Sequence, residues 1–124
     1  MSTLRVNTLQ DATGSNQPAM VGAAKAWVNF NGTGTVAIRE QFNLSSITDN
    51  GTGNYTVNFT TALLDANYSV GTETVNTSAG NNSFVRESAS SRATRTASAY
   101  QISIVQTASY GLTDCEYVCV TIHR

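Results

Sequence analysis

The most constraining feature of the chain is the segment Ala24–Val70, in which short runs of alternating apolar and polar residues are separated by turns rich in Gly and Asn. In Asn54–Thr60 the alternating apolar residues are Tyr55, Val57 and Phe59. Because successive side chains of a strand point to opposite faces, this pattern predicts a strand with one buried side and one side facing water. Asn-Gly pairs between the runs are a strong signal for hairpin turns. The segment therefore predicts an antiparallel sheet whose exposed side is covered by Thr and Asn.

The rest of the chain predicts more short strands and no convincing helix. The expected strands are Lys25–Phe30, Gly34–Phe42, Leu44–Ile47, Asn54–Thr60, Asn67–Val75, Ser83–Glu87, Tyr100–Thr107 and Glu116–Ile122. Seven to eight short strands at regular spacing are typical of an antiparallel β-sandwich, here expected to be jelly-roll-like.

One of these strands has an ambiguous pattern. In Gly34–Phe42, the residues expected to face the core are Val36, Ile38 and Phe42. Glu40 falls on the same parity. The strand therefore either leaves the core at this point or contains a β-bulge that resets its register. We expect both leucines of the loop Thr61–Ala66 to be exposed.

Composition and charge limit the classes of partner. Only 12% of the residues are charged and the formal net charge is −1, so nothing attracts nucleic acid or an anionic membrane surface. No apolar stretch resembles a signal peptide or a membrane span, and we expect synthesis in a cytoplasm without a cleavable signal and without membrane insertion. We expect residues 1–22 to form an extended docking or oligomerisation segment and residues 23–124 to form the sandwich.

The two cysteines are expected to be free. Cys115 and Cys119 lie four positions apart in a predicted strand, so they are expected to face the same side about 13 Å from each other, whereas a disulfide needs Cα atoms within about 7 Å. Two small, semi-buried thiols are the first interpretation, and an interchain disulfide is the alternative. Neither a metal nor a cofactor is expected, because a zinc site requires four ligands and His123 is the only histidine.

The sequence predicts no catalytic residue. A Ser-His-acid triad would have to use His123, the penultimate residue, and no nucleophile elbow is present. Two carboxylates could hydrolyse a glycosidic bond, but the candidate acids fall in or beside turns, where they are ordinarily solvated. These acids are Asp49, Asp65, Glu73, Glu87, Asp114 and Glu116.

Aromatic and loop residues supply the candidate binding sites. Trp27 and Tyr117 fall on the outward parity of their strands, which predicts either a subunit interface or a platform that stacks against sugar rings. Three arginines, Arg86, Arg92 and Arg95, lie close in sequence and could grip an anionic glycan, or else belong to a solvated polar loop. The candidate receptor-contact residues are Asn81, Asn82, Arg92, Arg95 and Tyr110, within the expected loops Asn76–Asn82, Ser88–Ala99 and Ala108–Asp114.

Three motifs in the first half of the chain carry a resemblance. They are W-x-x-F-N-G-T-G at Trp27–Gly34, N-x-S-S-I-T-D-N-G-T-G-x-Y-T-V-x-F at Asn43–Phe59, and D-A-N-Y at Asp65–Tyr68. The region from Ala24 to about Val75 resembles a module of tail-fibre and other appendage (receptor-binding) proteins of tailed bacteriophages of the marine or cyanobacterial type. Met1–Gly14 resembles the short segment that often precedes such domains.

The resemblance implies a homotrimeric β-sandwich head with a structural or adsorption role in the virion and no catalysis. The chain departs from the family in having almost no shaft and no His-x-His pair. We therefore expect a small knob that docks through its N-terminal segment onto another virion protein and contacts a host-surface glycan or protein. A head decoration or accessory knob on the capsid and a glycan-degrading tail enzyme are the alternatives.

Overall fold

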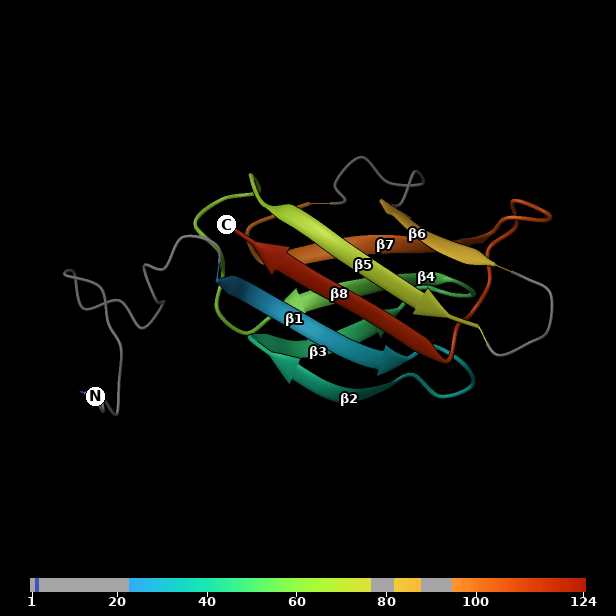
Figure 1. Ribbon diagram of the computed structural model, residues 1–124, viewed down its shortest axis with the longest axis horizontal. Helices are drawn as coiled ribbons and strands as arrows, with labels where there is room; N and C mark the ends of the chain where they lie inside the picture. The colour runs from blue at the N-terminus through green and yellow to red at the C-terminus, as the bar shows by residue number, and fades with distance from the viewer. Residues whose placement is uncertain (1, 3–22, 77–81, 88–94) are drawn as a thin grey trace.

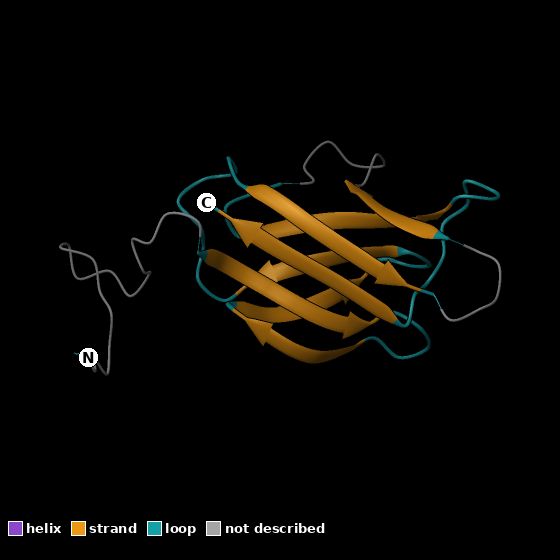
Figure 2. Cartoon of the chain, in the orientation of Figure 1, coloured by secondary structure: helices purple, strands orange, loops and turns teal. Residues whose placement is uncertain are grey.

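The structure is a computed structural model that describes residues 2, 23–76, 82–87 and 95–124. The described residues form eight strands and no helix (Figures 1 and 2). The strands are β1 (Ala24–Asn31), β2 (Ala37–Phe42), β3 (Leu44–Asp49), β4 (Asn54–Phe59), β5 (Ser69–Val75), β6 (Ser83–Glu87), β7 (Ala99–Gln106) and β8 (Tyr117–His123). Sheet A has the order β2-β1-β8-β5 and sheet B the order β3-β4-β7-β6, and every pairing is antiparallel.

The two sheets pack face to face around one core. Alternate residues of the strands point into it, as predicted for Val28, Tyr55 and Ile102. The ring of Phe30 on sheet A meets the ring of Tyr55 on sheet B edge to face, with 5.2 Å between centroids. The fully or nearly buried apolar residues are Ala26, Val28, Phe30, Leu44, Tyr55, Val57, Phe59, Leu63, Tyr68, Tyr100, Ile102, Ile104, Cys115, Val118, Val120 and Ile122.

The chain passes from sheet A to sheet B at Asn43, between β2 and β3. Asn43 has a positive φ of 58°, a conformation that Asn tolerates better than most residues. Its side-chain Nδ2 donates to the carbonyls of Lys25 and Thr61, and its Oδ1 accepts from the Thr61 N–H. One asparagine thus fastens the crossing to the first strand and to the loop after β4.

The predicted β-sandwich is confirmed, but its connectivity differs from that of a jelly roll. A jelly roll is a rolled hairpin in which the first strand pairs with the last, the second with the seventh and the third with the sixth. Here β1 does pair with β8, whereas β2 pairs with β1 and β3 with β4. The short Gly- and Asn-rich turns favour these local hairpins over pairings between distant strands.

The predicted burial of Phe42 is wrong, and a β-bulge is the reason. In the β1–β2 ladder Asn29 pairs with Glu40 and Phe30 with Ile38, which leaves Arg39 as the extra residue. Beyond the bulge Phe42 lies opposite Trp27, on the outer side of sheet A. Ile38 keeps the inward parity of Phe30 but is 37% exposed, because β2 is an edge strand with a partner on one side only.

Two other expectations about burial need correction. Leu63 is buried in the core, and only Leu64 of the loop pair is exposed; the Leu63 N–H donates to the Ala97 carbonyl, which draws the side chain inward. Cys115 and Cys119 do not share a face, because Cys115 precedes the start of β8 and lies in the core. Both are free thiols, and burial raises the pKa of Cys115.

Candidate functional site

The outer side of sheet A carries a group of large side chains that we call the aromatic face: Trp27, Arg39, Phe42, Val75, Tyr117 and Cys119. Residues opposite one another in a ladder lie on the same side of a sheet. Trp27 lies between Phe42 and Thr121, and Val75 lies opposite Tyr117. Phe42, which lies beside the partly buried Trp27, is 48% exposed, and Val75 and Tyr117, nearer the other end of the face, are 43% and 42% exposed. Trp27 and Tyr117 are thus placed outward, as predicted.

Arg39 orders one side of the aromatic face. Its guanidinium carbon lies 4.1 Å from the centroid of the Tyr117 ring, and its Nη1 donates to the Glu116 carbonyl at 2.5 Å. The bulge supplies the residue for this contact, since Arg39 has no partner in the ladder. An exposed cation–π contact of this kind stabilises by about 0.5–1 kcal/mol. Arg39 therefore ties the edge strand β2 to the start of β8.

The centre of the aromatic face also contains a polar atom without a described partner. Asn29 lies between Glu40 and Cys119 in the ladders. Its Oδ1 is buried and accepts no hydrogen bond from the described residues. Buried acceptors nearly always accept a hydrogen bond in folded proteins, so this oxygen is an exception to that rule on the aromatic face.

The outer side of sheet B is polar over β3, β4 and the start of β7, and we call this part the polar face: Ser46, Thr48, Asn54, Thr56, Asn58 and Gln101. Thr56 lies between Thr48 and Gln101, and Asn58 opposite Ser46. The Asn58 Nδ2 donates to Thr48 Oγ1 at 2.9 Å and to Ser46 Oγ at 3.1 Å. The layer of Thr and Asn predicted from the sequence is therefore present, with its side chains bonded to one another.

A buried tie between Tyr55 and Asp114 fixes the loop that precedes β8. The Tyr55 hydroxyl lies 2.5 Å from Asp114 Oδ1 and 2.8 Å from the Gly32 carbonyl. Asp114 Oδ1 also accepts the Gly53 N–H at 2.7 Å. Burial first, and then the bond to Asp114, raise the pKa of Tyr55, so its hydroxyl keeps the proton that it donates. Gly53 is required here, because it has a φ of +63° and a Cβ would lie 2.6 Å from the Thr113 nitrogen.

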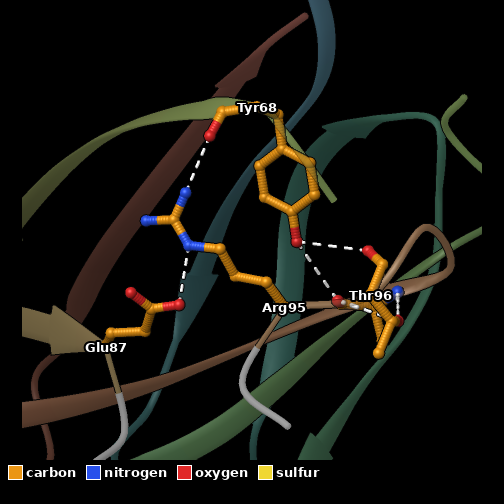
Figure 3. A network of polar contacts seen from close by, with 5 residues as sticks. Tyr68, Glu87, Arg95 and Thr96 are labelled. Carbon is orange, nitrogen blue, oxygen red and sulfur yellow. Dashed lines mark hydrogen bonds and ion pairs between the residues drawn. The ribbon is translucent and has the colours of Figure 1, made fainter. Parts of the chain in front are cut away.

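Arg95, a predicted receptor-contact residue, is engaged within the chain (Figure 3). Its Nε donates to Glu87 Oε1 at 2.6 Å and its Nη1 donates to the Tyr68 carbonyl at 2.7 Å. The guanidinium also lies over the rings of Tyr68 and Tyr100. Burial raises the pKa of Tyr68 to about 12. These contacts of Arg95 hold the segment that leads into β7 against the end of β6 and against the loop that precedes β5.

The other predicted contact residues that the structure describes lie at the opposite end of sheet B. Asn82 immediately precedes β6, and its carbonyl accepts from the N–H of Thr107. Tyr110 is 79% exposed and has a φ of 55°, in the loop after β7. The structure thus places Asn82 and Tyr110 at one end and Arg95 at the other. Asn81 and Arg92 lie outside the described residues, as does the proposed docking segment apart from Ser2.

Sequence reasoning missed an apolar row beside Tyr110. Val105 of β7 pairs with Phe84 of β6 on one side and forms an isolated bridge to Leu112 on the other. Phe84 and Leu112 are both exposed. Leu112 was assigned to a loop, and nothing in the local pattern predicts its pairing with Val105. The row is an apolar patch at the end of the sandwich that also carries Asn82 and Tyr110.

A shallow groove lies at the same end, between β5 and β6. Its volume is about 270 Å³, and its lining residues are Thr74, Val75, Asn76, Asn82 and Ser83. Ligand pockets usually span about 300–1,000 Å³, so this groove is small for a site that encloses a ligand. Its lining is mostly amide and hydroxyl groups, which suit hydrogen bonding to a partner that rests on the surface.

The candidate catalytic acids are dispersed. Asp65 pairs with Arg124, Glu87 pairs with Arg95, and Asp114 is bonded to Tyr55. The bond to Arg124 lowers the pKa of Asp65. Among the described residues, no three His, Cys, Asp or Glu side chains lie together in a way that could hold a metal ion.

Comparison with known protein families, with curated proteins and with solved structures found no match. Within the described ranges, no helix is long and apolar enough to cross a membrane. Functional inference therefore depends on the two outer faces, the loop end of the sandwich and the sequence motifs.

Proposed function

We propose that this chain is a structural protein of a tailed-bacteriophage virion, a tail-fibre-like knob that presents a β-sandwich for host attachment. The observation that carries the proposal is the contrast between the aromatic face of sheet A and the polar face of sheet B. A rigid sandwich with a group of large apolar side chains on one sheet and a layer of polar side chains on the other suits a domain that packs against copies of itself and presents the rest to its surroundings.

The motifs that resemble phage appendage proteins supply both parts of this arrangement. Trp27 of the first motif lies on the aromatic face, and Phe30 of the same motif packs against Tyr55 of the second. The second motif also provides Thr48, Thr56 and Asn58 of the polar face. The residues that carry the resemblance therefore have identifiable places in the core and on both faces, which supports the proposal.

In the proposed assembly, the aromatic face is the subunit interface of a homotrimer. The exposed side chains of Phe42, Val75 and Tyr117 provide apolar area that association would bury together with Trp27, and Trp, Tyr and Arg are the residues most often central to interfaces. The N-terminal segment, residues 1–22, would dock the knob onto another virion protein. Light scattering on the purified chain should give three times the monomer mass of 13.2 kDa, and a monomer would contradict the trimer.

The proposed contact surface is the end of the sandwich with Asn82, Tyr110 and the row of Phe84 and Leu112. Exposed aromatic rings stack against the apolar sides of sugars or side chains, while amide groups supply hydrogen bonds. Each such contact is weak, and several copies on one particle would raise the overall affinity without any new contact. A host-surface glycan or protein is the expected partner.

Immunogold labelling of purified phage particles tests the location. Label at the tail tip or fibres supports the attachment knob, whereas label on capsid faces would replace it with a head decoration or accessory protein. Adsorption tests the role: added purified chain should compete with particles for host cells, and a Tyr110→Ala, Phe84→Ala variant should compete less well. Release of soluble saccharide from host envelopes by the purified chain would instead identify a glycan-degrading enzyme.

A further inference from the structure

Two Asn-Gly pairs lie in turns of this chain, and the structure places them in opposite environments. They are Asn31-Gly32, which follows β1, and Asn50-Gly51, which joins β3 to β4. An asparagine followed by glycine is chemically special, because the absence of a Cβ lets the glycine nitrogen approach the asparagine side chain. The two pairs therefore allow the same reaction to be compared in two structural environments of one chain.

The reaction in question is spontaneous deamidation. The backbone nitrogen of the glycine attacks Cγ of the asparagine, a new N–Cγ bond forms, and the Cγ–Nδ2 bond breaks. Ammonia leaves and carries away the proton of the glycine N–H. Water then opens the resulting succinimide at either carbonyl, which leaves an aspartyl or an isoaspartyl residue. The reaction needs water and a backbone that can turn to bring the glycine nitrogen onto Cγ, and no oxidant or cofactor.

The fold holds the first pair in place. Gly32 is buried and its N–H donates to the Cys115 carbonyl at 2.9 Å. The Asn31 Nδ2 donates to the Thr33 carbonyl at 2.8 Å, and its Oδ1 accepts from the Thr33 hydroxyl. The Tyr55 hydroxyl lies against Gly32. Rotation of this peptide would break the bond to Cys115 and disturb the tie of Tyr55 to Asp114.

The second pair is open to water. Asn50 and Gly51 are both exposed, and Gly51 has a φ of +111° with open space around its Cα. The Gly51 N–H donates to Oδ1 of the exposed Asp49, and the Asn50 Nδ2 donates to Oγ1 of the half-buried Thr56 on the outer side of sheet B. Water can replace both of these surface bonds without disturbing the core, so the turn can reach the reactive geometry through a small local opening.

We propose that Asn50 is a site of spontaneous deamidation and that the fold protects Asn31. Each event adds one negative charge, which takes the formal net charge from −1 to −2. The new carboxylate lies next to Asp49 in a turn that also contacts Asp114 through Gly53. An isoaspartyl link also lengthens the backbone between the Asn50 N–H and the Asn54 carbonyl, a bond that closes the turn. The modification therefore acidifies and loosens one end of the sandwich over time.

The test is peptide mapping by mass spectrometry after the purified full-length chain has been incubated in warm, mildly alkaline buffer. Conversion is read from the mass change of exchanging NH for O and from enzymatic methylation of isoaspartyl groups. We expect Asn50 to convert at least about ten-fold faster than Asn31, which corresponds to a difference of about 1.4 kcal/mol in opening. Equal rates in the folded chain, or faster conversion of Asn31, would overturn the proposal.

Two controls separate the fold from the sequence. In strong denaturant both pairs should convert at similar rates, because each asparagine is followed by glycine; a persistent ten-fold preference for Asn50 there would remove the fold as the cause. An Asn50→Ser variant keeps a short polar side chain in the turn but lacks the amide. Its acidic charge variant should disappear from ion-exchange profiles, and an undiminished acidic peak would locate the reaction elsewhere in the chain.

Discussion

The two sheets of the sandwich have the same inward pattern and opposite outward chemistry. On sheet A, Trp27, Phe42 and Tyr117 face outward beside Arg39, and Glu40 and Glu73 lie on the same side. On sheet B the outward positions of β3 and β4 hold Thr, Ser and Asn, and those of β7 and β6 add Gln101, Val105, Phe84 and Arg86. The difference arises at alternate positions of the strands, because the inward positions of the central strands β1, β8, β4 and β7 are apolar and buried. The residues at the inward positions therefore specify the fold, and the residues at the outward positions determine how each side of the sandwich meets its surroundings.

The two faces also differ in how their side chains are satisfied. On the polar face the amides and hydroxyls bond to one another, as Asn58 does with Ser46 and Thr48. On the aromatic face large apolar groups remain about half exposed, and Asn29 Oδ1 is buried without a described partner. Exposed apolar area of this kind favours association, whereas a self-bonded polar layer is stable in water.

A matched pair of charge insertions tests this contrast most severely. Trp27→Asp places a carboxylate at the centre of the aromatic face, and Thr56→Asp places one at the centre of the polar face. If the aromatic face is the subunit interface, the first variant should weaken association by about 2 kcal/mol or more, the range of an interface hot spot. The second should leave association unchanged. Sedimentation velocity over a concentration series measures both.

The outcome of that pair is decisive in either direction. Circular dichroism should show strand content in both variants, so that a change of mass reports on association and not on folding. Dissociation by Thr56→Asp alone would move the interface to sheet B. An unchanged assembly in both variants would exclude both faces from it.

The next largest effect is expected from a change in the core, on which both faces depend. Tyr55→Phe removes the hydroxyl that bonds Asp114 and the Gly32 carbonyl. Since the variant loses the buried hydrogen bond to the Gly32 carbonyl and leaves Asp114 Oδ1 with only the Gly53 N–H, the free energy of unfolding should fall by about 1–3 kcal/mol. Urea unfolding measures it. Tyr110→Phe is the control, because Tyr110 is 79% exposed and should change stability by less than about 0.5 kcal/mol. Equal effects of the two variants would show that the tie to Asp114 adds nothing.

Two arginines on opposite sheets give a smaller and sharper comparison. Arg39 contacts the Tyr117 ring and the Glu116 carbonyl, while Arg86 of β6, opposite Ser103, makes no such contact with the described residues. Arg39→Ala should therefore lower the free energy of unfolding by about 1 kcal/mol, and Arg86→Ala by less than about 0.5 kcal/mol. Thermal unfolding of both variants measures the difference, which a reversed order would contradict.

The sequence predicted the sandwich because period-two patterning acts locally. The inward positions of β1, β4, β7 and β8 follow directly from alternation, as do the outward positions of Trp27 and Tyr117. Turns with Asn-Gly predicted the β1–β2 and β3–β4 hairpins. The prediction failed at Phe42 because the β-bulge at Arg39 changes parity within a strand, and the pattern indicated that a bulge was one alternative without showing where the face would switch.

Contacts between distant parts of the chain could not be read from local patterns. Tyr55 and Asp114 are 59 positions apart, and the bridge of Leu112 to Val105 joins an irregular loop to a strand. Arg95 was grouped with Arg92 by sequence proximity, yet its contacts are with Glu87 and Tyr68. Of the candidate site, the sequence therefore predicted the outward positions of Trp27 and Tyr117, but neither the exposure of Phe42 nor the apolar row of Phe84 and Leu112.

The smallest expected effect is on the polar face itself. Asn58→Ala removes the amide that bonds Ser46 and Thr48, but these groups are exposed and water replaces the lost partner. Stability should change by less than about 0.5 kcal/mol, and association should not change; urea unfolding and sedimentation measure the two. A loss above about 1 kcal/mol would mean that the side-chain layer holds β3 to β4. The side chains of the polar face would then stabilise the sandwich, and the contrast between a side that associates and a side that only faces water would not hold.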